Sequence, residues 1–465
     1  MNDDLQEWGE LPDGWAMVTL KSVLESHRGG VWGPEVENGK GYPVLRSTNM
    51  RGSKLDFSEV ARCEISDEVA RSAALQPGDI IVSKSSGSPH LVGLPALFEG
   101  SPDGQTYLCS NFTMRLRPDS ERIQPKYLFH FLAGAKAEAD RRSMAQDTAG
   151  LRNLKTSEYL SQELPLPPLP EQHRLVEKIE RLLSESRTAR EALDKVPALL
   201  KRFRQSVLAK AFRGELTGRD PGDEPASVLL ERIREERREI RNNGVKSKKY
   251  VEPGPPSTSG LPELPEGWCW ATLEELTSAV RVICYGILMP KENVPDGVLY
   301  VKVKDIKDDR INISSLHRTS KEIAAQYARA SLTPGDLLLA IRGTYGRVAE
   351  VPPELEGANI TQDTARLAVS ELMDRRYVAM HVRSTLTQNY FKAVARGVAV
   401  KGVNIADVRL CPIAVAPFAE QIRIVAKIEG LFAQAEAIER AVEAARRRAE
   451  KVDQAVLARA FRGEL

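Results

Sequence analysis

The sequence lacks long apolar runs, paired cysteines and a secretory leader. No stretch of eighteen consecutive apolar residues occurs, so the sequence predicts no membrane-spanning helix and no membrane partner. The first residues, MNDDLQEWGELPDGW, are acidic and contain neither the basic start nor the apolar core of a signal peptide. Five cysteines lie scattered without a Cys-x-x-Cys pair, which argues against a zinc site or disulfide framework: Cys63, Cys109, Cys269, Cys284 and Cys411. These absences predict a cytoplasmic protein with reduced thiols.

Motifs of known enzyme classes are also missing, apart from two imperfect matches. The segment GPEVENGKG (33–41) resembles a phosphate-binding loop, but its glycine spacing is one residue too long, and Gly41 stands where that loop needs Ser or Thr for magnesium. Asp296, Asp305 and Lys307 imitate a nuclease pattern, yet the carboxylates are too close in sequence to lie on the two neighbouring strands that this chemistry needs. The sequence therefore predicts a non-catalytic binding or scaffold protein without a metal site.

A large excess of one charge is missing as well. The chain carries 66 basic and 64 acidic residues and a formal net charge of +2. Phosphates respond to charges within a Debye length of about 10 Å, so the local distribution matters more than the total. A DNA-binding surface is possible only if basic residues gather on one face.

The sequence does contain a tandem repeat of about 250 residues. LPDGW (11–15) matches LPEGW (264–268), LQPGDIIVS (75–83) matches LTPGDLLLA (332–340), and AFRGEL occurs at both 211–216 and 460–465. The offset between matching residues drifts in the first part of each copy and stays fixed in the last part. Since loops tolerate length changes, we interpret the first part as variable and the last part as a segment whose register matters.

The fixed part of each copy predicts a long helix. Apolar residues recur at alternating spacings of 4 and 3 over five heptads, which is typical of a coiled coil. These predicted seam positions are Leu175, Ile179, Leu182, Leu193, Val196, Leu200, Phe203 and Val207 in copy one, and Ile424, Ile428, Leu431, Ile438, Val442, Val452 and Val456 in copy two. A helix over 171–213 would be about 64 Å long. Pro197 is expected to kink or interrupt it. The alternative is that each helix packs only on its own globular domain.

The variable part of each copy predicts a mixed α/β domain. Short strand-like runs such as DIIVS (79–83) and DLLLAI (336–341) follow a Pro-Gly-Asp turn and lead into the loops 83–94 and 341–351. Glycine allows close approach to a phosphate, while Arg and Lys supply charge and guanine contacts. The candidate DNA-binding residues are Arg46, Asn49, Arg51, Lys54, Lys84, Ser86, His90, Lys302, Lys304, Lys307, Arg342, Thr344, Tyr345 and Arg347. Ordinary glycine turns and solvated strand ends are the alternative interpretation.

In these motifs the sequence resembles the specificity subunits of type I restriction-modification systems. The resemblance rests on the paired LPDGW/LPEGW and PGD segments, LPLPPLPEQHRLVEKIERLL with its copy APFAEQIRIVAKIEGLF, AFRGEL after each predicted helix, and DPGDEPASVLLERIREER between the copies. It implies two mixed α/β target recognition domains joined by a long antiparallel two-helix coiled coil. The implied boundaries are 1–165 for recognition domain 1, 166–216 for the first helix, 217–260 for a charged helix and linker, 261–412 for recognition domain 2 and 413–465 for the second helix.

The resemblance also implies a function. Each recognition domain would read one half of a bipartite, asymmetric site in double-stranded DNA, and the helices would set the spacing. They would also dock two methyltransferase (M) subunits and the restriction (R) subunits. The chain would bind no cofactor itself, because S-adenosylmethionine, ATP and Mg would belong to the partner subunits.

Three alternatives stay open at this point. The chain could serve a smaller system in which one partner chain both cuts and methylates DNA. It could be a stand-alone metal-dependent nuclease using Asp296, Asp305 and Lys307. It could also be a coiled-coil scaffold without DNA contact, which salt-sensitive duplex binding would exclude.

Overall fold

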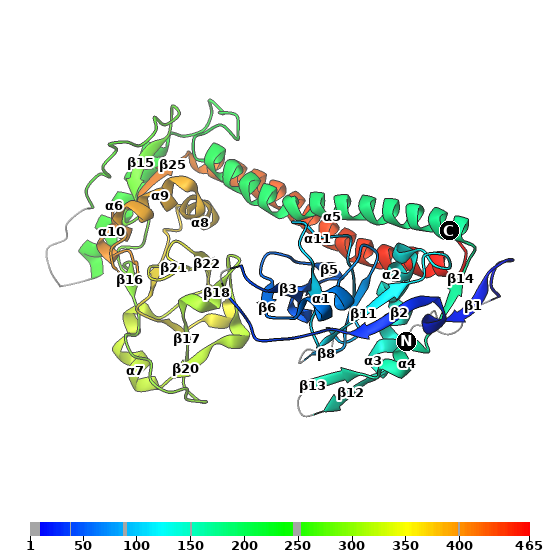
Figure 1. Ribbon diagram of the computed structural model, residues 1–465. Helices are drawn as coiled ribbons and strands as arrows, with labels where there is room; N and C mark the ends of the chain where they lie inside the picture. The colour runs from blue at the N-terminus through cyan, green and yellow to red at the C-terminus, as the bar shows by residue number, and fades with distance from the viewer. Residues whose placement is uncertain (1–9, 38, 87–90, 149–150, 245–252, 399) are drawn as a thin grey trace. The chain divides into compact units, whose positions relative to one another are not determined.

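The computed structural model describes residues 10–37, 39–86, 91–148, 151–244, 253–398 and 400–465 (Figure 1). The chain divides into two compact units. Unit 1 combines Met1–Lys195 with Val442–Leu465, and unit 2 is Val196–Ala441. No helix among the described residues is long and apolar enough to cross a membrane.

Unit 1 is built on a four-stranded antiparallel sheet with the order β2-β11-β7-β9: β2 (Leu24–Gly29), β11 (Thr113–Pro118), β7 (Ile80–Ser83) and β9 (Pro95–Leu97). β7 is buried along its whole length, as expected of a short, continuous apolar run that crosses a core. The remaining strands form a β10-β3-β6 sheet, a β4-β5 hairpin, a β1-β14 pair and a β12-β13-β8 sheet: β10 (Leu108–Cys109), β3 (Tyr42–Leu45), β6 (Ala61–Cys63), β4 (Met50–Arg51), β5 (Lys54–Leu55), β1 (Ala16–Thr19), β14 (Glu163–Leu166), β12 (Ala145–Thr148), β13 (Leu151–Leu154) and β8 (Ser85–Ser86).

Short helices cover the sheets of unit 1 and fill the connections between strands. They are η2 (Leu20–Val23), η3 (Ser47–Asn49), α1 (Asp67–Ala73), α2 (Pro125–Ala133), α3 (Ala135–Ser143) and α4 (Thr156–Leu160). α2 starts where its sequence predicts a helix start. Pro125 occupies its first turn, and the Gln124 side chain accepts the Tyr127 N–H.

Unit 2 repeats most of this topology, but none of its named strands corresponds to the β12-β13-β8 sheet. Its four-stranded sheet has the order β16-β24-β21-β22, its three-stranded sheet β20-β17-β23, and the β15-β25 and β18-β19 pairs match β1-β14 and β4-β5. These strands are β16 (Cys284–Tyr285), β24 (Thr364–Leu367), β21 (Leu337–Ala340), β22 (Val348–Glu350), β20 (His317–Thr319), β17 (Val298–Val301), β23 (Asn359–Ile360), β15 (Cys269–Thr272), β25 (Pro412–Val415), β18 (Ile306–Lys307) and β19 (Arg310–Ile311). The helices between them are η5 (Val303–Asp305), η6 (Ile313–Ser315), α7 (Lys321–Gln326), η7 (Ala328–Ala330), η8 (Pro353–Leu355), α8 (Arg375–Arg383), α9 (Thr385–Val394) and α10 (Ile405–Arg409). The repeat seen in the sequence is therefore a duplication of structure, and the mixed α/β fold class is confirmed.

Two long helices, α5 (Leu169–Ala211) and α11 (Phe418–Phe461), contribute to both units. In unit 1 the first turns of α5 share a buried cluster with the last turns of α11, through Leu175, Ile179 and Phe461. In unit 2 the last turns of α5 share a cluster with the first turns of α11, through Leu208 and Ile428. The helices are therefore antiparallel within each unit, as the family resemblance implies.

Charged pairs join the same two helices. Arg190 pairs with Asp453, and Arg446 pairs with Asp194, in unit 1. In unit 2 the Arg204 guanidinium donates two hydrogen bonds of 2.7 and 3.0 Å to the Glu439 carboxylate. A bidentate geometry of this kind fixes the relative register of two helices better than a single contact does.

The predicted seam is buried at its ends and interrupted elsewhere. Leu175, Ile179, Leu200, Val207, Ile424, Ile428 and Val442 are buried, and Leu182, Leu193, Val196, Leu431 and Val456 are half-buried. Phe203, Ile438 and Val452 are exposed, so the prediction of a continuous buried stripe is wrong at these positions. A straight helix drifts by about 20° per heptad relative to a 3.5-residue repeat, which turns such positions off the contact face. Arg204, the residue after Phe203, contacts α11 instead: its guanidinium lies 5.9 Å from the centre of the Phe432 ring.

Pro197 lies inside α5 without interrupting it, so the expected interruption is wrong, while the expected kink stays a prediction. Proline removes one backbone hydrogen bond and crowds the preceding turn. Packing at both ends of α5 compensates, because Leu175 and Ile179 are buried in unit 1 and Val207 and Leu208 in unit 2.

The two AFRGEL segments complete the cores of the two units. Phe461 packs with its ring centroid 5.2 Å from Tyr127 and 5.4 Å from Phe131, in unit 1. Phe212 packs 5.3 Å from Tyr377 and 4.6 Å from His381, in unit 2. Each sequence copy therefore ends in the core formed by the other copy, which explains why both copies keep the hexapeptide.

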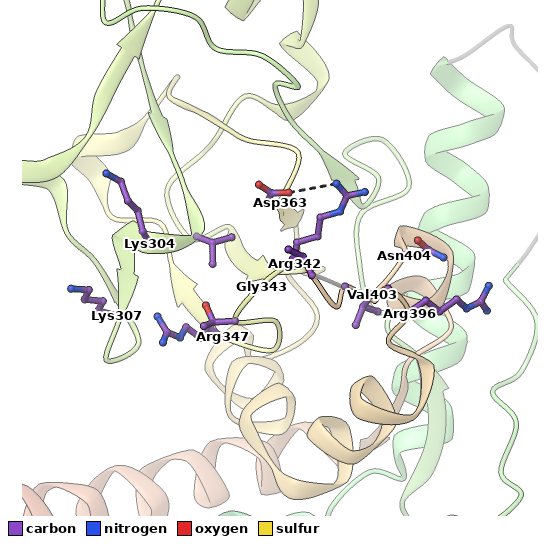
Figure 2. A pocket seen from close by; sticks show the side chains of 14 residues that line it. Lys304, Lys307, Arg342, Gly343, Arg347, Asp363, Arg396, Val403 and Asn404 are labelled. Atoms are coloured by element: carbon purple, nitrogen blue, oxygen red, sulfur yellow. Dashed lines mark ion pairs between the residues drawn. The ribbon is translucent and has the colours of Figure 1, made fainter. Parts of the chain in front are cut away.

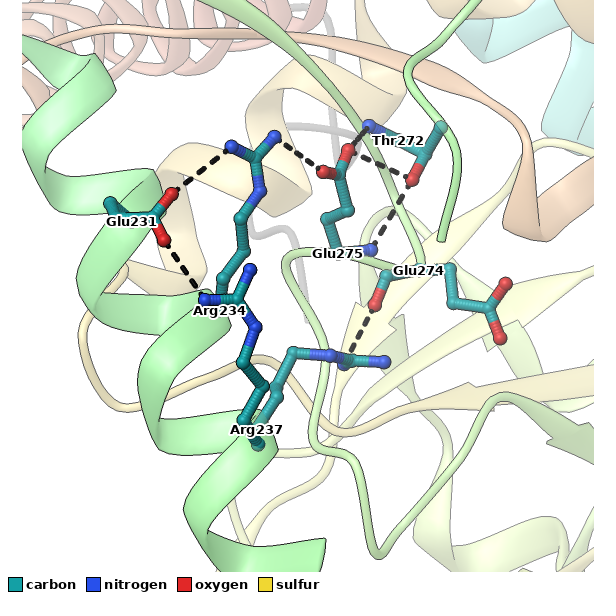
Figure 3. Close-up of polar contacts among 7 residues, drawn as sticks. Glu231, Arg234, Arg237, Thr272, Glu274 and Glu275 are labelled. Carbon is teal, nitrogen blue, oxygen red and sulfur yellow. Dashed lines mark hydrogen bonds and ion pairs between the residues drawn. The ribbon is translucent and has the colours of Figure 1, made fainter. Parts of the chain in front are cut away.

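The charged helix predicted between the copies is α6 (Ala226–Gly244), and it belongs to unit 2. Four apolar side chains on one face are buried in the unit 2 core: Ala226, Leu229, Leu230 and Ile233. Figure 3 shows the polar contacts beside this face: Arg234 lies between Glu231 and the buried Glu275, and Arg237 donates to the Glu274 carbonyl oxygen. α6 is thus a packed element rather than part of a free linker.

Candidate nucleic-acid interface

Both units place the same backbone frame at the end of the central strand. In unit 1 the Lys84 N–H donates to Phe112 O and the Leu154 N–H donates to Lys84 O, both at 2.8 Å. In unit 2 the Ile341 N–H donates to Asp363 O and the Val403 N–H donates to Ile341 O, again at 2.8 Å. We call this arrangement the strand-end frame. It brings together three segments that are far apart in the sequence.

The strand-end frame of unit 2 borders a hollow of about 910 Å³ (Figure 2). Its lining includes five cationic side chains: Lys304, Lys307, Arg342, Arg347 and Arg396. Asp363 is the one carboxylate among the lining residues, 3.8 Å from the Arg342 guanidinium. The near-neutral composition allows a DNA-binding surface only where basic residues gather on one face. The hollow is such a place, and its local excess of positive charge suits a polyanion.

The β18-β19 hairpin presents Lys307 to this hollow. Its two turn residues, Asp308 and Asp309, have positive φ angles of 47° and 63°, as a tight two-residue hairpin turn requires. The Asp309 carboxylate lies 3.0 Å from Nε of Arg383, and burial lowers the pKa of that guanidinium. The Arg347 guanidinium donates to Ile306 O at 3.1 Å, which ties the loop after β21 to the hairpin.

Five residues predicted in unit 2 meet in the hollow, and two do not. Lys304, Lys307, Arg342, Thr344 and Arg347 line it. The Lys302 ammonium lies instead 5.1 Å from the centre of the Tyr300 ring, and Tyr345 packs against the unit 2 core. Sequence reasoning missed Arg396 and Asn404, which the chain delivers from a segment just before α10. No local pattern marks these two residues, because a long-range bridge between Arg342 and Gly402 brings their segment to the hollow.

In unit 1 the predicted residues are spread over several elements. Arg46 lies 3.8 Å from Glu35, Arg51 lies 3.2 Å from Asp56, and Lys54 is exposed on β5. Lys84 and Ser86 are half-buried beside the strand-end frame. His90 lies outside the described residues.

Asn49 is a structural residue, and we withdraw it from the candidate set. It is 4% exposed, and its amide oxygen accepts the Arg46 N–H at 3.0 Å. Its amide nitrogen donates to Asp56 O and Glu59 O. With every polar group used inside the fold, the side chain has nothing left to offer a base edge.

Asp305 occupies the equivalent place in unit 2, which removes a carboxylate from the nuclease alternative. It is 2% exposed, accepts the Lys302 N–H at 2.9 Å, and accepts a hydrogen bond from the Ser315 hydroxyl at 3.1 Å. Asp296 lies exposed in the turn before β17. Within the described ranges, no three His, Cys, Asp or Glu side chains gather where they could hold a metal ion.

The chain is similar to known proteins along nearly its whole length. The family model of the type I restriction modification DNA specificity domain matches residues 12–196. The EcoBI specificity subunit of Escherichia coli is 26% identical over 458 residues, which cover 97% of this chain and 86% of that protein. The EcoKI specificity subunit of Escherichia coli strain K12 is 26% identical, with 98% and 90% covered.

Solved structures share the fold. The HsdS subunit of Thermoanaerobacter tengcongensis superposes with a TM-score of 0.60 at 20% identity, over 98% of both chains. A chain from a study of assembly and conformational transition of the type I R-M system gives a TM-score of 0.63 at 18% identity, over 98% of this chain and all of that one. Residues 12–196 therefore match the type I restriction modification DNA specificity domain, and the chain as a whole is similar to type I specificity subunits.

Proposed function

We propose that this chain is the sequence-reading subunit of a type I restriction-modification enzyme, in which each unit binds one half of a bipartite, asymmetric DNA site. The observation that carries the proposal is the basic hollow beside the strand-end frame of unit 2. It combines five cations with the glycines Gly343, Gly397 and Gly402, so backbone and charge can both approach a phosphate. Similarity to type I specificity subunits supplies the reaction context.

The two long helices have separate roles in this proposal. α5 and α11 set the distance between the half-sites and dock two methyltransferase subunits and the restriction subunits. S-adenosylmethionine, ATP and Mg would be bound by those partners, where transfer of the methyl group and cleavage of the DNA take place. The chain itself contributes affinity and sequence choice.

A DNA-binding measurement on the assembled complex tests the charge argument. The triple variant Lys304→Ala/Lys307→Ala/Arg347→Ala should weaken binding to all duplexes and lower the slope of log affinity against log salt by roughly 0.9 per lost phosphate contact. Lys321→Ala removes an exposed charge on α7, outside the hollow, and serves as the control. An unchanged salt slope in the triple variant would show that the hollow does not contact DNA.

Sequencing of methylated adenines tests the function itself. Cells that carry this gene should show a bipartite methylated motif that disappears when the gene is deleted. Purification through this chain should recover separate methyltransferase and restriction subunits, whereas a single partner that cuts and methylates would indicate the smaller system. Metal-dependent cleavage by the chain alone would contradict a non-catalytic role.

A further inference from the structure

The two strand-end frames hold different side chains at equivalent backbone positions. In unit 1 the β8–β13 register pairs Ser85 with Asn153, and in unit 2 a bridge pairs Arg342 with Gly402. The third position is the residue whose carbonyl oxygen accepts the strand-end N–H, Phe112 in unit 1 and Asp363 in unit 2. We propose, on the basis of the proposed function, that these three positions determine the DNA sequence read by each unit, and that Arg342 reads a guanine.

The backbone on both sides of Arg342 is fixed by hydrogen bonds. The residue on each side of Arg342 forms a backbone hydrogen bond. The Ile341 N–H donates to Asp363 O at 2.8 Å, and the Gly343 N–H donates to Lys401 O at 3.1 Å. A Cβ on Gly402 would lie 2.8 Å from Arg342 Cγ, so the glycine makes room for the arginine stem. With its backbone already fixed, this position loses less entropy when the arginine engages a base.

The geometry around the guanidinium suits a base edge. The Asp363 carboxylate lies 3.8 Å from one terminal nitrogen of the Arg342 guanidinium, and the Arg342 side chain remains 57% exposed. The other N–H groups can therefore form the bidentate contact that arginine makes with O6 and N7 of guanine in the major groove. Lys304 and Lys307 are compact charges on exposed positions at the other side of the hollow, which suits contacts with phosphate.

The set in unit 1 has different chemistry. The buried Ser85 hydroxyl donates to the Asn153 amide oxygen at 2.5 Å, and Phe112 is 49% exposed. None of the three carries a charge. An apolar ring fits the methyl group of thymine, so Phe112 matches an A·T pair, and the set offers no planar pair of donors for guanine. One scaffold with two side-chain sets thereby accounts for an asymmetric target.

The test uses cells that express the complete complex, with the methylated motif read by sequencing. Arg342→Ala should relax one guanine position in one half-site, with discrimination there falling roughly ten- to a hundred-fold, while the other half-site stays unchanged. Arg342→Lys keeps the charge and the aliphatic stem, and it should lose the same discrimination because it lacks the planar fork. Phe112→Ala should relax an A·T position in the opposite half-site only.

The outcomes separate this inference from the proposed function. If Arg342→Ala lowered methylation at every site while the motif stayed intact, Arg342 would be a phosphate contact and the inference would be overturned. Full retention of the motif by Arg342→Lys would overturn it equally. Lys321→Ala, the exposed charge control, must leave the motif and its methylation level unchanged. If the unaltered complex showed no motif at all, the proposed function itself would fail.

Discussion

Two glycines in the AFRGEL segments permit the exchange of helix ends between the repeat copies. Gly214 and Gly463 have φ angles of +71° and +74°. A Cβ on either residue would lie 2.2 Å from a proline Cγ, that of Pro265 for Gly214 and that of Pro12 for Gly463. Both prolines belong to the LPEGW and LPDGW motifs, so the two repeated motifs meet in each unit.

Replacing either glycine should therefore destabilise its own unit. Gly214→Ala and Gly463→Ala each combine a left-handed backbone with a steric clash, which together cost about 2–5 kcal/mol of unfolding free energy. Urea unfolding measures the effect. Gly218 has no atom near its missing Cβ and no positive φ, so Gly218→Ala is the matched control and should change stability by less than about 0.5 kcal/mol. Equal losses in all three variants would contradict the packing argument.

Two buried histidines make the protein sensitive to acid. Burial lowers the pKa of His130 to about 4 and that of His381 to about 3. His381 uses both ring nitrogens inside the fold: Nδ1 lies 3.0 Å from the Thr387 hydroxyl, and Nε2 accepts the Ala414 N–H. The neutral ring is therefore the form that the folded state accommodates.

The sign of the pH dependence follows from these shifts. Below the ordinary histidine pKa of 6.5, the unfolded chain binds protons that the folded chain rejects. The contribution of these histidines to the free energy of unfolding is therefore fully present above pH 6.5. It falls as the pH drops towards 4, by at most about 1.4 kcal/mol per pH unit for each histidine. Urea midpoints measured between pH 7.5 and 4.5 check this expectation. His130→Gln should flatten the curve, and an unchanged slope would mean that His130 is not the responsible group.

The surface exposure of several candidate DNA-binding residues was predictable from the sequence. Lys304, Lys307, Arg342 and Arg347 sit in glycine- and strand-end contexts that predict surface exposure, and the structure brings them to one hollow. Asn49 stands in a similar context, but its place at the end of a 3-10 turn decides its role, and sequence pattern does not reveal that hydrogen bonding. Pairing of Arg342 with Gly402 depends on a long-range bridge that no local pattern encodes.

At the level of elements, α6 shows how a charged helix can be an integral part of a domain. The Glu275 carboxylate is 2% exposed and accepts hydrogen bonds from the Thr272 N–H at 2.7 Å and from Arg234 at 2.9 Å. The apolar face of α6 packs beside this contact. The sequence predicts the helix correctly from its charge and periodicity, but the few apolar residues on its buried face are too sparse to predict its docking site.

Removing the α6 contact should therefore loosen unit 2. Arg234→Ala leaves a buried carboxylate short of its cationic partner, which costs about 1–3 kcal/mol. Arg232→Ala removes a neighbouring arginine whose partner, Glu224, is exposed, and the loss should stay within about 0.5 kcal/mol. Comparing the two variants by thermal unfolding isolates the buried pair. Similar effects of both changes would mean that α6 contributes only through its apolar face.

The long helices were predictable because a heptad pattern repeats over many turns, so local errors average out. The seam fails at Phe203, Ile438 and Val452, since a fixed 3.5-residue repeat ignores the drift of a real helix. Antiparallel pairing was predicted from the family resemblance and is present within each unit. The exchange of AFRGEL between copies was not predictable, because sequence periodicity does not show which domain receives a helix end.

At the scale of the whole molecule, duplication lets two α/β units share one pair of helices. Each of α5 and α11 has residues in both units, and the ion pairs Asp194–Arg446 and Arg204–Glu439 hold their register. Under the proposed function, the length of the helices therefore sets the distance between half-sites. Matched deletion of one heptad from each helix, residues 192–198 and 445–451, removes about 10.5 Å of helix and turns the remaining faces by only about 20°.

We expect this double deletion to shorten the spacer of the methylated motif by up to about three base pairs, at 3.4 Å each, while both half-sites keep their sequences. Sequencing of methylated adenines in cells that express the altered complex measures spacer and half-sites together. Deleting the heptad from α5 alone is the control, because it displaces one helix against the other and should abolish methylation rather than shift the spacing. A methylated motif with the original spacer after the double deletion would show that helix length does not determine the distance between half-sites.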